Sequence, residues 1–169
     1  MNFSAACSPA KRKRMKSNVK KCLWGLFLLA VSSSGCDPKT DCCTNIDTDV
    51  RIHYVTSAGA NLINSAADFK EENIKVYYKN GGAYEYIYHG NLDYPNMHYV
   101  YENENHDLIL TVFPSNYYEN KYSTTLIKLN EQTVDTLFCA FELSGNSEVC
   151  TNAWLNGVQM EGRFIEVMK

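Results

Sequence analysis

Residues 74–89 read IKVYYKNGGAYEYIYH, and they set the fold class of the chain. Apolar and polar residues alternate on both sides of a glycine pair, which is the pattern of β-strands with one buried face. Asn80, Gly81 and Gly82 stand between the two runs, and such residues favour tight turns. The stretch therefore predicts a β-hairpin.

The register of this hairpin depends on the length of its turn. A two-residue turn at Asn80–Gly81 would set Val76 opposite Glu85. A three-residue turn, Asn80 to Gly82, pairs Val76 with Tyr86 and keeps one face apolar. We expect the three-residue turn, because a glycine is also available for the left-handed position that such loops need.

Short strands separated by turn residues continue along the chain. Leu108 to Phe113, LILTVF, is apolar nearly throughout, which indicates a central strand covered on both faces. The other strands are expected at 50–54, 97–101, 122–129, 133–143, 148–155, 158–160 and 164–168. No long helical periodicity appears after residue 35. The pattern predicts an all-β fold, an antiparallel β-sandwich of about 7–9 strands.

The N-terminal segment has the order of an export signal. Lys20 and Lys21 precede an apolar run at 22–31, and the small residues 32–35 lead to Cys36. A cysteine directly after Ser-Gly resembles the lipobox of bacterial lipoprotein signal peptides. This resemblance implies cleavage before Cys36 and lipidation of that cysteine.

Two alternatives to lipidation exist for this segment. A transmembrane anchor fits less well, because residues 22–35 are shorter than the about 20 apolar residues of a membrane span. Ordinary secretion with cleavage elsewhere would leave Cys36 as a plain structural cysteine. We expect a chain anchored by lipid to the outer membrane of a cell envelope, on its periplasmic face or at the cell surface.

The chain therefore divides into three expected parts. Residues 1–35 form the signal peptide, of which residues 1–14 are either an over-extended start or a long basic leader. Residues 36–49 hold the lipidated cysteine and a polar, flexible tether. Residues 50–169 form the β-sandwich domain.

Charge argues against nucleic acid as a partner. The chain has 16 basic and 19 acidic residues, and seven of the basic ones but no acidic one lie in residues 1–35. Residues 36–169 thus keep 9 basic against 19 acidic residues, a net charge of −10. Such a surface repels nucleic-acid phosphates.

Cysteines in an exported chain suggest a disulfide. Cys139 and Cys150 flank a predicted turn. A two-residue turn at Ser144–Gly145 sets them opposite each other and in reach of a bridge. A three-residue turn gives a better apolar face but sends the two sulfurs to opposite sides, so both possibilities stay open. Cys42 and Cys43 are candidates for other bridges or for free thiols.

No catalytic, metal or cofactor site is expected. The chain has no hydrolase, metalloprotease or phosphate-loop motif. No second cysteine pair or neighbouring histidine pair completes a zinc site. The four histidines are scattered along the sequence: His53, His89, His98 and His106. We expect a protein that is not an enzyme.

Tyrosine is the residue type that hints at binding. Eleven of the twelve tyrosines lie between Tyr77 and Tyr122. Tyrosine combines an apolar ring with a polar tip, which suits sugar stacking and protein interfaces. The alternative is that the rings fill the core or brace the sheets. The candidate ligand-binding aromatics are Tyr77, Tyr117 and Tyr118.

Several short runs resemble a group of small, uncharacterised lipoproteins of Bacteroides-type bacteria. The runs are Ile74–Tyr78 before Asn80–Gly81, Thr124–Asn130, Asp135–Leu137 and Ala153–Gly157. The resemblance implies an immunoglobulin-like or transthyretin-like sandwich and supplies no site. Two functions are therefore expected: a non-catalytic binding or assembly module of the cell envelope, or a sugar-binding accessory of a glycan-uptake system.

Overall fold

The structure, a computed structural model, describes residues 44–169. These residues form two β-sheets. The larger sheet contains β1 (Asn45–Asp47), β3 (Lys75–Asn80), β4 (Ala83–Tyr86), β7 (Tyr122–Lys128), β8 (Val134–Ser144), β9 (Ser147–Leu155) and β10 (Val158–Gln159). The smaller sheet contains β2 (Val50–Val55), β5 (His98–Glu102), β6 (Leu108–Val112) and β11 (Phe164–Met168).

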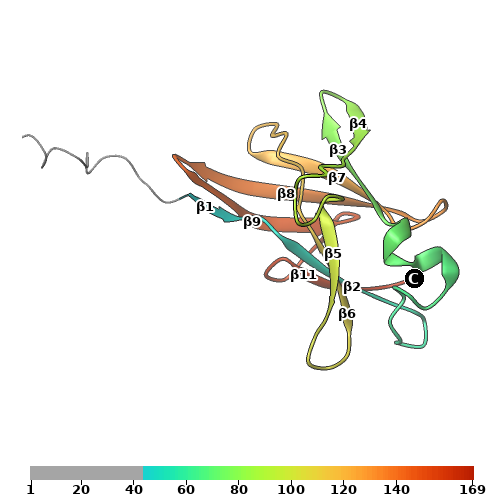
Figure 1. Cartoon of the computed structure of the whole chain (residues 1–169). Helices are drawn as coiled ribbons and strands as arrows, with labels where there is room; N and C mark the ends of the chain where they lie inside the picture. Colours follow the sequence, from blue (N-terminus) through green and yellow to red (C-terminus); the bar gives the residue numbers. More distant parts are fainter. Residues whose placement is uncertain (1–43) are drawn as a thin grey trace, which may run out of the picture. The chain divides into compact units, whose positions relative to one another are not determined.

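The two sheets lie in separate layers, with β7, β8 and β9 across from β2, β6 and β11 (Figure 1). The predicted all-β sandwich is therefore confirmed. Two short 3-10 turns, η2 (Ala67–Phe69) and η3 (Glu71–Asn73), lie between β2 and β3. Within residues 44–169, no helix has the length and apolar character needed to cross a membrane.

The strand order differs from a purely antiparallel sandwich. The larger sheet runs β1-β9-β8-β7-β3-β4 with β10 beside β9, and the smaller sheet runs β11-β2-β6-β5. Two pairs are parallel, β1 with β9 and β11 with β2. Strand β1 lies inside residues 36–49, which we expected to form a flexible tether. The sequence does not predict this strand, because three residues carry too little alternation. Both sheets are therefore mixed.

The hairpin of β3 and β4 has a register that we did not predict. Asn80 pairs with Ala83, so the turn consists of Gly81 and Gly82 alone. Both glycines have positive φ, +55° and +100°, which the two-residue hairpin turn requires. Neither turn considered from the sequence is correct, because only this placement gives both left-handed positions to glycine.

The shifted register reverses the faces of β4. Val76 now faces Ile87, whose N–H donates to the Val76 carbonyl at 3.1 Å. Tyr84 and Tyr86 point outward with Tyr77, which pairs with Tyr86. The expected contact of Val76 with Tyr86 in the core is therefore wrong, although Val76 itself is fully buried.

The core lies between the two sheets and follows the period of two. In β2, Val50, Ile52 and Tyr54 are fully buried, and their partners across the core include Leu137 and Ile127. Complete burial of such side chains contributes about 1.5–3 kcal/mol each. Strand β6 is buried on both faces over Ile109–Val112, as its sequence predicts.

A β-bulge interrupts the long hairpin of β8 and β9. Its two-residue turn is Gly145–Asn146, since Ser144 pairs with Ser147. Near the turn Phe141 pairs with Cys150, whereas beyond the bulge Cys139 pairs with Ala153. Both registers considered from the sequence are therefore incorrect, because each included Ser144 in the turn and neither allowed for the bulge.

A buried polar contact joins the two sheets. The Tyr54 hydroxyl donates to Asp135 Oδ2 at 2.8 Å, from β2 to β8. The other carboxylate oxygen of Asp135 accepts from Asn156 Nδ2 at 2.7 Å and from Lys169 Nζ at 2.5 Å. Burial, and then the nearby Asp135 carboxylate, raises the pKa of Tyr54 well above its ordinary value, so the hydroxyl remains a donor.

Replacing Val76 with aspartate is expected to destabilise the sandwich by about 3–5 kcal/mol, because it buries an unpaired charge. Val134 is the matched control, since it lies on a strand with 48% of its side chain exposed. Thermal or urea unfolding measures both variants. A Val76→Asp variant as stable as Val134→Asp would contradict the core position of Val76.

Replacing Tyr54 with phenylalanine is expected to cost about 1.5–3 kcal/mol, because a buried carboxylate loses a donor. Tyr88→Phe is the control, since Tyr88 is 62% exposed. Urea unfolding at neutral pH compares the two. Equal stability of both variants would show that the Tyr54–Asp135 contact does not hold the sheets together.

Candidate functional site

An open groove of about 260 Å³ lies on the outer face of the larger sheet. We call it the aromatic groove. Its lining comes from β3, β7, β8 and the segment before β7: Lys79, Tyr117, Glu119, Asn120, Tyr122, Ser123, Thr124 and Phe138. A concave site that combines aromatic rings with a few polar groups is the usual form of a small-ligand site.

A tight turn positions one end of the groove. Glu119 and Tyr122 exchange backbone hydrogen bonds of 2.8 and 3.0 Å. Asn120 and Lys121 between them have φ values of 53° and 71°. Asparagine tolerates this left-handed backbone better than most residues. The turn therefore sets Glu119 and Tyr122 opposite each other at this end of the groove.

Exposed rings continue from the groove across the sheet. Tyr122 and Phe138 are nearly parallel, with an interplanar angle of 8° and centroids 5.2 Å apart. Phe138 also contacts Trp154 on β9, with centroids 5.7 Å apart. Tyr122 is 43% exposed and Phe138 is 39% exposed. The three rings form a row across three adjacent strands, β7, β8 and β9.

Polar groups of both charges border the rings. Lys79 Nζ lies 3.9 Å from Glu119 Oε2, and the Glu119 side chain is largely exposed. An exposed pair of this kind adds little stability. Thr124 and Asn120 add a hydroxyl and an amide. The groove therefore offers donors and acceptors around a hydrophobic ring surface.

The three tyrosines predicted as ligand contacts have different positions. Tyr117 is 42% exposed and lines the groove, with its ring edge-on to Tyr78 at 6.4 Å. Tyr77 is half-buried on the same face and contacts Tyr86, with ring centroids 5.6 Å apart. Tyr118 instead packs on Phe141, and the structure does not place it in the groove.

The hydroxyl of Tyr118 donates to Glu148 Oε1. Burial, together with this hydrogen bond, raises the pKa of Tyr118 above its ordinary value. The neighbouring residues Tyr117 and Tyr118 therefore differ in their surroundings. Tyr117 is exposed to solvent, whereas Tyr118 packs on Phe141 of β8.

Sequence reasoning missed Tyr122, Phe138 and Trp154. Phe138 lies between the inward residues Leu137 and Cys139, so the period of two already assigns it to the outer face. What the sequence does not contain is the alignment of β7, β8 and β9, which brings the three rings into one row.

A second, larger groove of about 670 Å³ runs along β5, the last strand of the smaller sheet. Tyr94 stacks on Tyr99 with centroids 4.3 Å apart, and the two rings cover each other's faces. Glu71 Oε1 already accepts a hydrogen bond of 3.0 Å from the Val100 N–H. Tyr122 and Phe138 are also stacked, but their centroids are 5.2 Å apart and both rings are exposed, so we take the aromatic groove as the stronger candidate.

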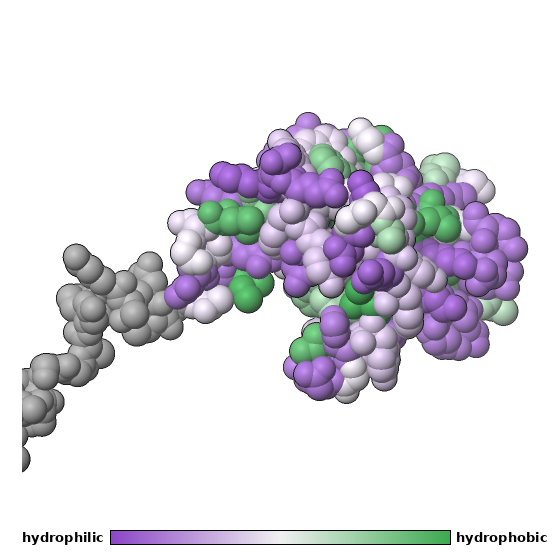
Figure 2. All heavy atoms as spheres, turned by 90° about the horizontal axis from the view of Figure 1, so that it is seen from above, coloured by the Kyte–Doolittle hydropathy of each residue, from purple (hydrophilic) through white to green (hydrophobic). Residues whose placement is uncertain are grey.

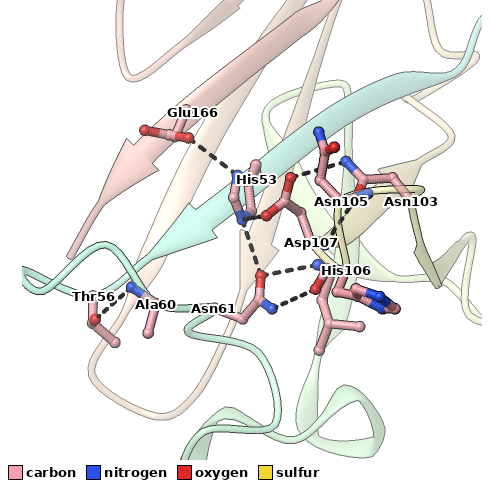
Figure 3. Close-up of polar contacts among 10 residues, drawn as sticks. His53, Thr56, Ala60, Asn61, Asn103, Asn105, His106, Asp107 and Glu166 are labelled. Atoms are coloured by element: carbon pink, nitrogen blue, oxygen red, sulfur yellow. Dashed lines mark hydrogen bonds and ion pairs between the residues drawn. The ribbon is translucent and has the colours of Figure 1, made fainter.

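A polar cluster on the outer face of the smaller sheet surrounds His53 (Figure 3). His53 Nδ1 lies 3.1 Å from Glu166 Oε2, and Nε2 lies 3.0 Å from Asn61 Oδ1. The same amide oxygen accepts from the Leu108 N–H at 2.9 Å, while Asn61 Nδ2 donates to the His106 carbonyl at 3.0 Å.

Both ring nitrogens of His53 therefore face acceptors, and the residue is 6% exposed. The partners of the ring are the carboxylates of Glu166 and Asp107 and the amide oxygen of Asn61. The role of the cluster is to tie the loop at Asn61 and the β5–β6 connection to β2 and β11. Sequence reasoning did not bring these residues together.

The face of the molecule seen in Figure 2 is mainly hydrophilic. Figure 2 shows one face on which hydrophobic residues form separate small patches rather than one continuous area. In residues 44–169, no three or more His, Cys, Asp or Glu side chains are grouped so that they could hold a metal ion. Cys36, the predicted lipid site, lies outside the described residues, as do Cys42 and Cys43.

Comparison with known proteins adds no relative from which a function could be transferred. No protein-family model matches the chain, no curated protein matches it, and no solved structure matches its fold.

Proposed function

We propose that the chain is a non-catalytic binding module of the cell envelope, anchored to the outer membrane by lipid on Cys36, whose ligand is a glycan. The anchor rests on the order of basic, apolar and small residues before Cys36. Residues 37–44 lie between that cysteine and β1 in the sequence.

The observation that carries the proposed ligand is the row of exposed rings at the aromatic groove. Tyr122 and Phe138 are nearly parallel, and Tyr117 lines the same groove. The apolar face of a sugar ring packs on an aromatic ring, while its hydroxyl groups need donors and acceptors nearby. Lys79, Glu119 and Asn120 supply donors and acceptors at the edge of the rings.

Size and charge also favour a neutral glycan. A groove of about 260 Å³ suits one or two sugar units rather than a large cofactor. The net charge of −10 over residues 36–169 disfavours polyanions. The other expected function, an assembly module that binds a protein, uses the same rings, since tyrosine is common at protein interfaces.

Replacing Cys36 with alanine is expected to abolish lipid attachment, because the acyl acceptor is removed. Cells that express each variant are labelled with a fatty-acid analogue, and the label on the protein is measured. A Cys42→Ala/Cys43→Ala variant is the control and should keep its label. Equal labelling of wild type and Cys36→Ala would exclude this anchor.

Replacing Tyr122 or Phe138 with alanine is expected to weaken glycan binding about ten-fold or more, because each removes an anchoring ring. Binding of the purified chain is first surveyed on a glycan array, and the affinity is then measured by calorimetry. Tyr88→Ala is the control, since this exposed tyrosine lies outside the groove.

The two expected functions give different results in this experiment. Loss of binding in Tyr122→Ala and Phe138→Ala, with Tyr88→Ala unaffected, supports the glycan site. If no glycan binds, or if all three folded variants bind equally well, the groove is not a glycan site. Capture of an envelope protein that depends on Tyr122 and Phe138 would then support the assembly module.

A further inference from the structure

The bulge of the β8–β9 hairpin places two cysteines on the same face. Cys139 is fully buried and Cys150 is 3% exposed, and both belong to the core between the sheets. Cys139 pairs with Ala153, while Cys150 pairs with Phe141. In a regular ladder, residues three apart on β9, such as Cys150 and Ala153, would point to opposite faces.

The bulge removes this conflict. Between Ala140 and Phe141 the register shifts by one residue, so the β9 side carries one residue more. Cys150 and Ala153 can then both point inward. The hydroxyl of Thr151 contacts the Ala140 carbonyl at 3.3 Å, on the opposite side of the hairpin from the core. The two thiols become diagonal neighbours across adjacent strands.

Both thiols are free and buried in the structure, and their environments differ. The hydrogen bond between them lowers the pKa of Cys150 and raises that of Cys139. Arg163 lowers the pKa of Cys150 further. The Arg163 guanidinium lies 2.7 Å from Asp47 Oδ1 and 3.0 Å from the Asp47 carbonyl, so it is fixed between the cysteines and β1.

We propose that Cys139 and Cys150 are a disulfide site that locks β9 to β8 directly beneath the point where β1 joins the sandwich. Strand β1 pairs with residues 147–149 of β9, immediately before Cys150. A bond from Cys150 to Cys139 would therefore join the part of β9 that pairs with β1 to β8 by a covalent cross-link.

Formation of the bond needs an oxidant, which we take to be a disulfide-bonded thiol compound. The Cys150 thiolate attacks one sulfur of that disulfide and expels one thiolate, which leaves a mixed disulfide on Cys150. The Cys139 sulfur then attacks the Cys150 sulfur and expels the second thiolate. The two protein thiols lose two protons and two electrons, and the oxidant is reduced to two thiols. Since both cysteines are buried, oxidation precedes complete packing of the hairpin.

The chain offers a direct assay for this bond. No Lys or Arg lies between Lys128 and Arg163, so trypsin releases residues 129–163 as one peptide that contains Cys139 and Cys150 as its only cysteines. The reduced, denatured full chain is refolded with a mixture of reduced and oxidised glutathione. Free thiols are then blocked with iodoacetamide before digestion and mass spectrometry.

The proposal predicts a peptide 129–163 that is lighter by two hydrogen atoms and carries no alkyl group, and that accepts two alkyl groups after reduction. Two alkylated cysteines without reduction would overturn it, as would attachment of either cysteine to glutathione or to any other cysteine of the chain. The assay uses wild-type protein, so it does not depend on a variant that folds. It is also performed outside the cell, so its failure is distinct from failure of the proposed export or of glycan binding.

A second measurement tests the effect of the bond on stability. Closing a loop between residues 139 and 150 is expected to raise the Tm by about 5–10 °C. Addition of a reductant should lower the Tm of wild type by this amount and leave a Cys139→Ser/Cys150→Ser variant unchanged. A Cys42→Ser/Cys43→Ser variant is the control and should respond like wild type. An equal response of the wild type and the Cys139→Ser/Cys150→Ser variant would show that the bond does not stabilise the hairpin.

Discussion

The buried hydrogen bond from Tyr54 to Asp135 constrains how the two sheets of the sandwich are positioned relative to each other. It places a charged carboxylate, 1% exposed, between two sheets that are otherwise held together by apolar packing. A buried carboxylate is costly unless its oxygens are satisfied. Asn156, from the β9–β10 turn, and Lys169, at the end of β11, supply the remaining donors. One carboxylate therefore fixes the relative positions of four segments that are distant in the sequence.

This fixed arrangement gives the outer faces of the sheets a rigid support. The aromatic groove is built on β3, β7 and β8, whose inward residues, among them Val76, Ile127 and Leu137, are fully buried. Rings held on packed strands lose little freedom when a ligand binds, which favours affinity. Rings on strands, such as Tyr122 and Phe138, are therefore expected to bind a ligand at a smaller entropic cost than tyrosines on loops.

The β-bulge allows both Cys150 and the apolar residues of β9 to face the core. From the sequence, either the cysteines or the apolar residues of β9 could face the core, but not both. The extra residue at the bulge lets Cys150, Ala153 and Leu155 all point inward. The bulge also lies next to the pairing of β1 with β9, so it is located where the N-terminal part of the chain joins the sandwich.

The amino-acid sequence by itself determined the fold class, most of the strands and the doubly covered strand β6, because hydrophobic periodicity is a local signal. It also assigned Tyr117 to a candidate binding surface. The tertiary structure alone decided the registers at Gly81–Gly82 and at the bulge, since one residue of slip reverses every face and leaves the composition unchanged. For the same reason, only the alignment of β7, β8 and β9 could bring Tyr122, Phe138 and Trp154 into one row.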